Sequence, residues 1–244
     1  MAEIDALKQR VAQSCRILGR LDLTNAATGH VSARLPGTER VFIRARGPGE
    51  TGVRYTTEAE VIEVGIDGAP MAANDRGLAV PNEVFIHTEI YRARPAVNAV
   101  VHIHPPTVVL FTICDLPLLP LYGAFDPWGA QIALQDVPRY ERSTTIRNRD
   151  LGRDFVKAMG DSELCLMRGH GITAASRSVE EATMLAITLN RLAEMNYRAR
   201  LLGAPREIPD EDRAAFAPSG LLDAVRARHA ATLWRYYLTL TESG

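Results

Sequence analysis

Lysine is almost absent from this sequence. Of the 28 lysines and arginines in 244 residues, only Lys8 and Lys157 are lysines, and both lie beside polar residues in helical patterns. Because a Schiff-base enzyme needs a desolvated lysine in its pocket, covalent catalysis by lysine is not expected. The formal net charge of −1 argues against the basic surface that nucleic-acid or anionic-membrane binding requires. We therefore expect no nucleic-acid partner and no membrane partner.

Cysteines and long apolar runs are also scarce. Cys15, Cys114 and Cys165 are odd in number and far apart in the sequence, which argues against a disulfide framework and favours a cytoplasmic protein with packed thiols. No apolar run approaches the roughly 18–20 residues of a membrane span, and the N-terminus lacks the apolar segment of a signal peptide. A content of 46% hydrophobic and 23% charged residues is typical of one globular domain.

The order of hydrophobic patterns predicts an α/β protein. Helical spacing and capping signals predict five helices, at 4–21, 82–93, 150–159, 178–202 and 220–240. Alternating patterns predict strands within 25–45, 61–68, 97–104 and 163–176. Residues 107–135 cannot be divided into elements. Because helices and strands do not alternate regularly, we expect mixed or antiparallel strands in a single domain, 1–244, with 206–244 as a C-terminal helical extension.

Three histidines carry the main chemical signal. His102 and His104 are two residues apart in VVHIHPP, and alternate residues of a strand project from the same face. His170 stands between glycines in RGHG, where the backbone can turn sharply. Three neutral imidazoles with an open position indicate a catalytic metal site. The alternative is that these histidines are ordinary core residues.

Two further side chains, Glu83 and His87, each have two possible roles. Glu83 opens the helix that precedes the histidine-bearing strand, so it either transfers protons and binds the metal or only stabilises the helix N-terminus. His87, one turn later, either orients Glu83 or is a structural histidine. His229 is predicted to lie on the surface.

The segment PNEVFIHTEIYRARPAVNAVVHIHPP, followed by RGHGITAAS and a long helix ending in RLLG, resembles the class II aldolase and adducin family over about residues 5–205. The resemblance implies an αβα sandwich with a central, mainly antiparallel sheet. It also implies one divalent metal ion per subunit (Zn, Mn, Fe or Co) and a homotetramer with active sites between subunits.

The same resemblance assigns roles to individual residues. It implies that His102, His104 and His170 are the metal ligands, and that Glu83 is the catalytic residue and can also approach the metal. Tyr140, in VPRYERSTT, matches a tyrosine that reaches a neighbouring subunit's active site in the family's sugar-phosphate aldolases. Its alternative is a loop tyrosine at an interface.

The segments that hold phosphate in those aldolases are altered in this chain. Gly29-His30-Val31-Ser32 replaces a Gly-Asn-x-Ser motif, the RARGPG segment at 44–49 replaces a Thr-Gly loop, and Pro81-Asn82 replaces a Ser-Ser pair. Neutral hydroxyl and amide donors thus give way to imidazole, guanidinium and proline.

These replacements favour a pocket for a carboxylate. We predict that His30, Ser32, Arg44 and Arg46 bind the substrate, because arginine presents a planar fork that matches a carboxylate. Arg44 and Arg46 alternate along a strand, so both point into the pocket or both point to solvent.

An altered pocket of this kind is similar to that of the family's metal-dependent decarboxylases of hydroxylated aromatic or heteroaromatic dicarboxylates, such as dihydroxyphthalate or hydroxy-methylpyridine-dicarboxylate. We therefore predict a carbon–carbon lyase that removes CO2 from a hydroxylated aromatic acid, in the catabolism of aromatic compounds. The alternatives are a retro-aldolase acting on a non-phosphorylated or acidic hydroxy-carbonyl compound, an iron-dependent oxygenase, and an adducin-like interaction module. Tyr122, Phe125 and Trp128 either stack on the aromatic substrate or fill a core or interface.

Overall fold

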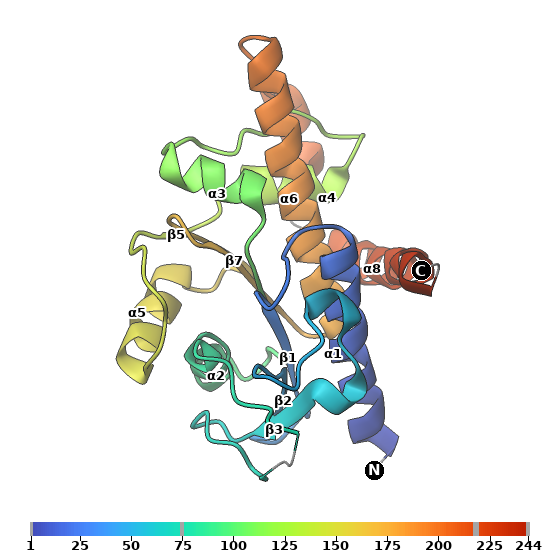
Figure 1. Ribbon diagram of the computed structural model, residues 1–244. Coiled ribbons are helices and arrows are strands. Elements are labelled where there is room, and N and C mark those ends of the chain that lie inside the picture. Colours follow the sequence, from blue (N-terminus) through green and yellow to red (C-terminus); the bar gives the residue numbers. More distant parts are fainter. Residues whose placement is uncertain (1, 74–75, 217–219, 243–244) are drawn as a thin grey trace.

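One seven-stranded sheet organises the protein. The computed structural model describes residues 2–73, 76–216 and 220–242 (Figure 1). The strands are β1 (His30–Arg34), β2 (Val41–Arg44), β3 (Val61–Val64), β4 (Ala99–Ile103), β5 (Arg139–Tyr140), β6 (Leu164–Met167) and β7 (Gly171–Ser176). Their order in the sheet is β3-β2-β1-β4-β7-β6-β5, and only the β5–β6 pair is parallel. The mainly antiparallel sheet predicted from the sequence is confirmed.

Eight α-helices flank or extend the sheet in the described residues. They are α1 (Ala2–Arg20), α2 (Val84–Ala93), α3 (Pro106–Ile113), α4 (Pro127–Leu134), α5 (Arg149–Met159), α6 (Val179–Leu202), α7 (Asp210–Arg213) and α8 (Gly220–Glu242). Three short 3₁₀ turns, η1 (Val53–Tyr55), η2 (Glu58–Glu60) and η3 (Ala214–Phe216), complete the chain. None of the described helices is long and apolar enough to span a membrane.

The pleat of the strands sends alternate residues to two different layers. Val31 and Val101 pack in the core shared with α1 and α6, whereas Val100 packs in the core shared with α2 and α5. In Figure 1, α1, α6 and α8 lie on one side of the sheet and α2 and α5 on the other. This αβα arrangement gives every central strand two buried faces, which is why the five residues of β4 are all buried.

The predicted elements are present, and two elements lie inside the segment that the sequence left undivided. Both α3 and α4 begin with a proline, at Pro106 and Pro127, which suits the first turn of a helix. Helix α6 begins where predicted, because the Ser178 side chain accepts a hydrogen bond from the Glu181 backbone N–H at 3.2 Å. The prediction of three packed thiols is wrong at Cys114, which is exposed after the end of α3.

The C-terminal helix packs against the body of the chain. Trp234 and Tyr237 of α8 and Trp128 of α4 belong to the core that contains α1 and α6. Trp128 thus fills a core on the sheet face opposite α2, while Phe125 is 76% exposed. Tyr122, Phe125 and Trp128 were expected either to stack on a substrate or to fill a core or interface, and Trp128 fills a core within this chain.

Candidate metal centre

A stripe of polar residues on α2 faces a second stripe on the sheet. Glu83, at the start of α2, His87 and Tyr91 are four residues apart and so share one face of the helix. His30 and Ser32 of β1 point to the same side of the sheet as each other, and His30 lies directly opposite His102 of β4. All five side chains are buried or nearly so between the two elements. We call the space between these two stripes the polar seam.

Three histidines and one glutamate meet at the open end of the polar seam. The Nε2 atoms of His102 and His104 are 3.0 Å apart. Glu83 Oε2 lies 3.6 Å from His102 Nε2 and 3.3 Å from His170 Nε2. One ligand atom from each of the four residues lies within 4.8 Å of the others. The structure therefore brings together all four residues that the sequence singled out as metal ligands.

The donor set fits a divalent cation. Ligand atoms bound at about 2.1 Å from one ion stand roughly 3–4 Å from each other, and the shortest separations in this cluster fall in that range. Burial lowers the pKa of His102 below its ordinary value and lowers that of His104 to about 3. Both imidazoles are thus neutral, which is the form that binds a metal.

A side chain behind His102 selects its tautomer. His102 Nδ1 lies 3.3 Å from Thr173 Oγ1, and the Thr173 hydroxyl donates to Met167 Sδ at 3.5 Å. Because the Thr173 proton is used in that contact, its oxygen accepts the Nδ1–H of His102. The lone pair of His102 is then on Nε2, toward the cluster.

Glu83 does not cap its helix. Its side chain makes no capping hydrogen bond; instead Oε1 accepts the backbone N–H of Ile146 at 2.8 Å, and Oε2 faces the histidines. Burial raises the pKa of Glu83, but hydrogen bonds and charge interactions with His102 and His170 outweigh burial and hold this pKa well below its ordinary value. The geometry thus favours a role for Glu83 in metal binding or proton transfer over a role in stabilising the helix N-terminus alone.

Two glycines place His170. Gly169 adopts φ +59° in the turn between β6 and β7, a left-handed conformation that glycine tolerates best. A Cβ atom at Gly171 would stand 2.2 Å from the Ile103 carbonyl oxygen and 2.8 Å from the His104 ring. Only glycine therefore allows the turn to approach β4 closely enough for His170 to join the cluster.

The polar seam continues beneath the cluster as a chain of hydrogen bonds. His30 Nδ1 lies 2.7 Å from His87 Nε2, His87 Nδ1 lies 2.7 Å from Ser32 Oγ, and Ser32 Oγ lies 2.7 Å from the Tyr91 hydroxyl. His87 is thus engaged with His30 and Ser32. Ser32 is fully buried, so the prediction that it binds the substrate directly is not supported by its position.

The two arginines that were expected to share a face both contact Glu50 but differ in exposure. Arg44 lies on the α1 side of the sheet and is fully buried, where Nε donates to Thr56 and the rest of the guanidinium binds Ala27 O, Gly29 O and Glu50. The prediction that Arg44 binds the substrate is therefore wrong. Arg46 is 35% exposed and lies 3.3 Å from Glu50.

Tyr140 is not brought to the cluster. Its side chain is buried on the α5 side of the sheet, where the hydroxyl donates to Asp154 at 3.1 Å and the ring packs edge-on against Phe155. Within this chain Tyr140 packs at the edge strand β5, and its expected role at a neighbouring subunit's active site stays a prediction.

Comparison with known proteins places this arrangement in a family. A family model described as the class II aldolase and adducin N-terminal domain matches residues 9–197. The chain belongs to the class II aldolase and adducin family. It is similar to 3,4-dihydroxyphthalate decarboxylase of Arthrobacter keyseri, with 38% identity covering 95% of this chain and 92% of the relative. A 3,4-dihydroxyphthalate decarboxylase of Terrabacter sp. (strain DBF63) is 41% identical over 88% of this chain and 90% of the relative.

A solved structure of the family has the same fold. L-fuculose 1-phosphate aldolase from Glaciozyma antarctica PI12 superposes with a TM-score of 0.80, covering 99% of this chain and 90% of that one, at 19% identity. The αβα sandwich implied by the resemblance of the sequence to the class II aldolase and adducin family is therefore confirmed.

Three contributors to the centre were not found from the sequence. Tyr91 continues the four-residue spacing of Glu83 and His87, so helical periodicity could have indicated it. Thr173 lies opposite His102 across the β4–β7 pair, and strand register is not visible in a single sequence. The Ile146 contact is a backbone N–H, which carries no residue-type signal.

The metal site gives a first prediction. We expect the purified chain to bind about one divalent ion, and His104→Ala to weaken binding by more than about a hundredfold, because outer-shell losses alone cost ten- to hundredfold. Equilibrium dialysis with metal analysis measures this. His229→Ala, at an exposed histidine of α8, is the matched control, and equal affinity of the two variants would contradict the assignment.

The polar seam gives a second prediction, on acid stability. Burial lowers the pKa of His87 to about 3, whereas an unfolded chain gives histidine about 6.5. Below about pH 6.5 the unfolded chain binds a proton that the folded chain refuses, so stability falls as the pH falls toward about 3. Glutamine does not titrate, so replacing His87 by glutamine removes this difference in proton binding between the folded and the unfolded chain.

We expect His87→Gln to flatten the dependence of unfolding free energy on pH by about 1.4 kcal/mol per pH unit between about pH 4 and 6. Urea unfolding at several pH values measures the slope. His229→Gln should leave the slope unchanged, and a wild-type slope in His87→Gln would show that His87 is not held neutral.

Proposed function

We propose that the protein is a metal-dependent, non-oxidative decarboxylase of a hydroxylated aromatic dicarboxylate of the 3,4-dihydroxyphthalate type. The observation that carries the proposal is the similarity to two 3,4-dihydroxyphthalate decarboxylases at 38% and 41% identity along most of both chains. The intact cluster of Glu83, His102, His104 and His170 supports it. An interaction module without chemistry would have no use for four converging ligands.

The surroundings of the cluster suit an acidic substrate. His30 lies beside His102, with ring centroids 5.1 Å apart, and its Nδ1 is already bound to His87. Its Nε2 is therefore the nitrogen left for a ligand. After burial and the neighbouring histidines, the charge of Arg46 also lowers the pKa of His104, which places a cation near the cluster. His30 and Arg46 thus supply two donors that a ring carboxylate can accept.

His102, His104, His170 and Glu83 are the side chains that would hold the metal, whose identity among Zn, Mn, Fe and Co is left open by this ligand set. The chemistry that the ion supplies when bound is Lewis-acid stabilisation of negative charge on substrate oxygen. Glu83, ionised because its pKa is held low, accepts the proton of the ring hydroxyl next to the reacting carboxylate. It then delivers that proton to the ring carbon bearing the carboxylate.

The carbon–carbon bond breaks after this proton transfer. The carboxylate leaves as CO2, its bonding electron pair returns to the ring and restores aromaticity, and a solvent proton returns to the hydroxyl oxygen. The net reaction consumes one proton and needs no oxidant. Burial of Glu83 between α2 and the backbone of Ile146 keeps its carboxylate fixed during both transfers.

We further propose that copies of the chain assemble into a homotetramer with sites at subunit boundaries. Apolar side chains of α3 support this, since Leu110 and Ile113 are 42% and 53% exposed. Ile113 approaches Gly169, next to His170. A subunit covering α3 would therefore also cover the rim of the metal centre.

The proposed reaction gives a third prediction. With metal bound, the protein should convert 3,4-dihydroxyphthalate to 3,4-dihydroxybenzoate with one CO2 released per turnover. Glu83→Gln should lower kcat by about 10²–10⁴, the usual contribution of a positioned acid–base group. CO2 release and product chromatography measure both, with metal content determined for each variant.

Glu141→Gln is the control, because Glu141 is an exposed carboxylate paired with arginines. It should keep wild-type kcat. Release of an aldehyde from a hydroxy-carbonyl compound without CO2 would favour the retro-aldolase, and dependence on O2 would favour the oxygenase.

Arg46 gives a fourth prediction, on substrate class. Arg46→Met should raise KM for the dicarboxylate by on the order of tenfold, because it removes a charge-assisted hydrogen bond. KM for 2,3-dihydroxybenzoate, which has a single carboxylate beside its hydroxyl, should change much less. Arg40→Met is the control, because Arg40 lies just before the start of β2, at the other end of the strand from Arg46, and pairs with Glu63. Equal increases for both substrates would exclude recognition of the second carboxylate by Arg46.

A further inference from the structure

The closed end of the polar seam holds four groups that each can donate or accept a proton. They are Tyr91, Ser32, His87 and His30, joined by three contacts of 2.7 Å. All four side chains are buried, and His87 and Ser32 are fully so. A buried chain of this kind has two possible proton orders, running in opposite directions.

The end of the chain at Tyr91 decides between the two orders. In one order the Tyr91 O–H donates to Ser32, the Ser32 hydroxyl donates to His87 Nδ1, and His87 Nε2–H donates to His30 Nδ1. Every proton then has an acceptor. In the other order Ser32 donates to the Tyr91 oxygen, and the phenol proton has no acceptor among the hydrogen bonds of the described residues. A buried O–H without a partner costs free energy, so the first order is favoured.

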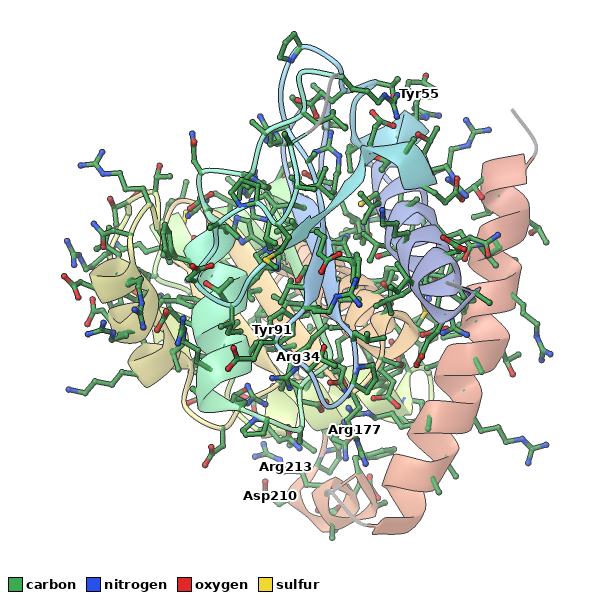
Figure 2. The ribbon with its side chains drawn as sticks, turned by 90° about the horizontal axis from the view of Figure 1, so that it is seen from below. Arg34, Tyr55, Tyr91, Arg177, Asp210 and Arg213 are labelled. Atoms are coloured by element: carbon green, nitrogen blue, oxygen red, sulfur yellow. The ribbon has the colours of Figure 1, made fainter. Side chains whose placement is uncertain are left out.

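Two features keep the Tyr91 end in place. Burial raises the pKa of Tyr91 well above 10, so the phenol keeps its proton. The Arg34 guanidinium lies 5.1 Å over the Tyr91 ring and donates to the Tyr91 and Val97 carbonyl oxygens (Figure 2). Arg34 thereby fixes the end of α2 against β1, and the phenol with it.

We propose that Tyr91, Ser32 and His87 act as positioning residues that hold neutral His30 with its proton on Nε2, so that His30 donates a hydrogen bond to a substrate carboxylate. Nδ1 of His30 is the acceptor in this order, which leaves the Nε2–H beside His102. A donor at this place suits a carboxylate, whereas the opposite tautomer would set a lone pair against it. The identity of the ligand rests on the proposed function; the proton order does not.

The first experiment reads the tautomer directly. In zinc-loaded protein labelled with ¹⁵N-histidine, nuclear magnetic resonance should show His30 protonated at Nε2 and unprotonated at Nδ1, with the signals assigned by their loss in His30→Ala. A His30 protonated at Nδ1 in the wild type would overturn the proposal. This readout holds whether or not the protein releases CO2.

The second experiment uses a matched pair at position 87. In His87→Gln the amide can donate to His30 and its carbonyl can accept from Ser32, so the order is kept. In His87→Glu the carboxylate accepts at both ends and moves the His30 proton to Nδ1. We expect KM for the dicarboxylate within about threefold of wild type in His87→Gln and raised on the order of ten- to a hundredfold in His87→Glu, with little change in kcat.

A third variant protects the test against misfolding of His87→Glu. Tyr91→Phe removes the phenol, and the Ser32 hydroxyl proton then has an acceptor only at His87 Nδ1, so His30 should stay protonated at Nε2 in the labelled protein. Tyr237→Phe is the control, because the Tyr237 hydroxyl is buried without a hydrogen-bond partner in the described residues. A His30 protonated at Nδ1 in Tyr91→Phe, or equal KM values in the two His87 variants of an active enzyme, would overturn the relay. An inactive wild type with the expected tautomer would refute only the proposed function.

Discussion

The match between the step of a helix and the step of a strand underlies the whole centre. Four residues of α2 advance about 6 Å, and two residues of a strand advance about 6.6 Å. Glu83, His87 and Tyr91 therefore stay level with successive positions along the sheet over two steps. A stripe of polar groups on the helix can meet a stripe on β1 only because of this match. Arg34 fixes the match by binding the Tyr91 carbonyl in the last turn of α2 and the Val97 carbonyl in the loop after it.

Burial sets the chemistry of the polar seam. Polar groups removed from water must be hydrogen-bonded or must become neutral, and the histidines satisfy both conditions. At the closed end, hydrogen bonds use the hydroxyl proton of Ser32 and both ring nitrogens of His87. At the open end, the Nε2 atoms of His102 and His104 converge with an ionised Glu83 beside them. The same burial thus produces an inert network at one end and a ligand set at the other.

Local periodicity explains which parts of the centre could be predicted from the sequence. The H-x-H pattern places His102 and His104 on one strand face, and the glycines around His170 require a close turn, so these ligands follow from rules of local geometry. Arg44 was misplaced because its position depends on which face of the sheet β2 turns to α1. Counting alternate residues from Phe42, which packs with α1, would have put Arg44 on that side. The contact of Glu83 with the Ile146 N–H and the pairing of β4 with β7 are tertiary contacts, which local sequence patterns do not reveal.

Arg44 influences the substrate pocket without touching it. Glu50 binds Arg44 through one oxygen and lies 3.3 Å from Arg46 through the other. One negative charge thus lies between two positive charges, and the three side chains carry a net charge of +1. Arg44 is fully buried, and its guanidinium donates to Thr56 and to the Gly29 carbonyl oxygen as well as to Glu50. Glu50 therefore offsets only one of the two positive charges, and the group keeps one positive charge. The two arginines therefore act together, although only Arg46 is placed to meet a carboxylate.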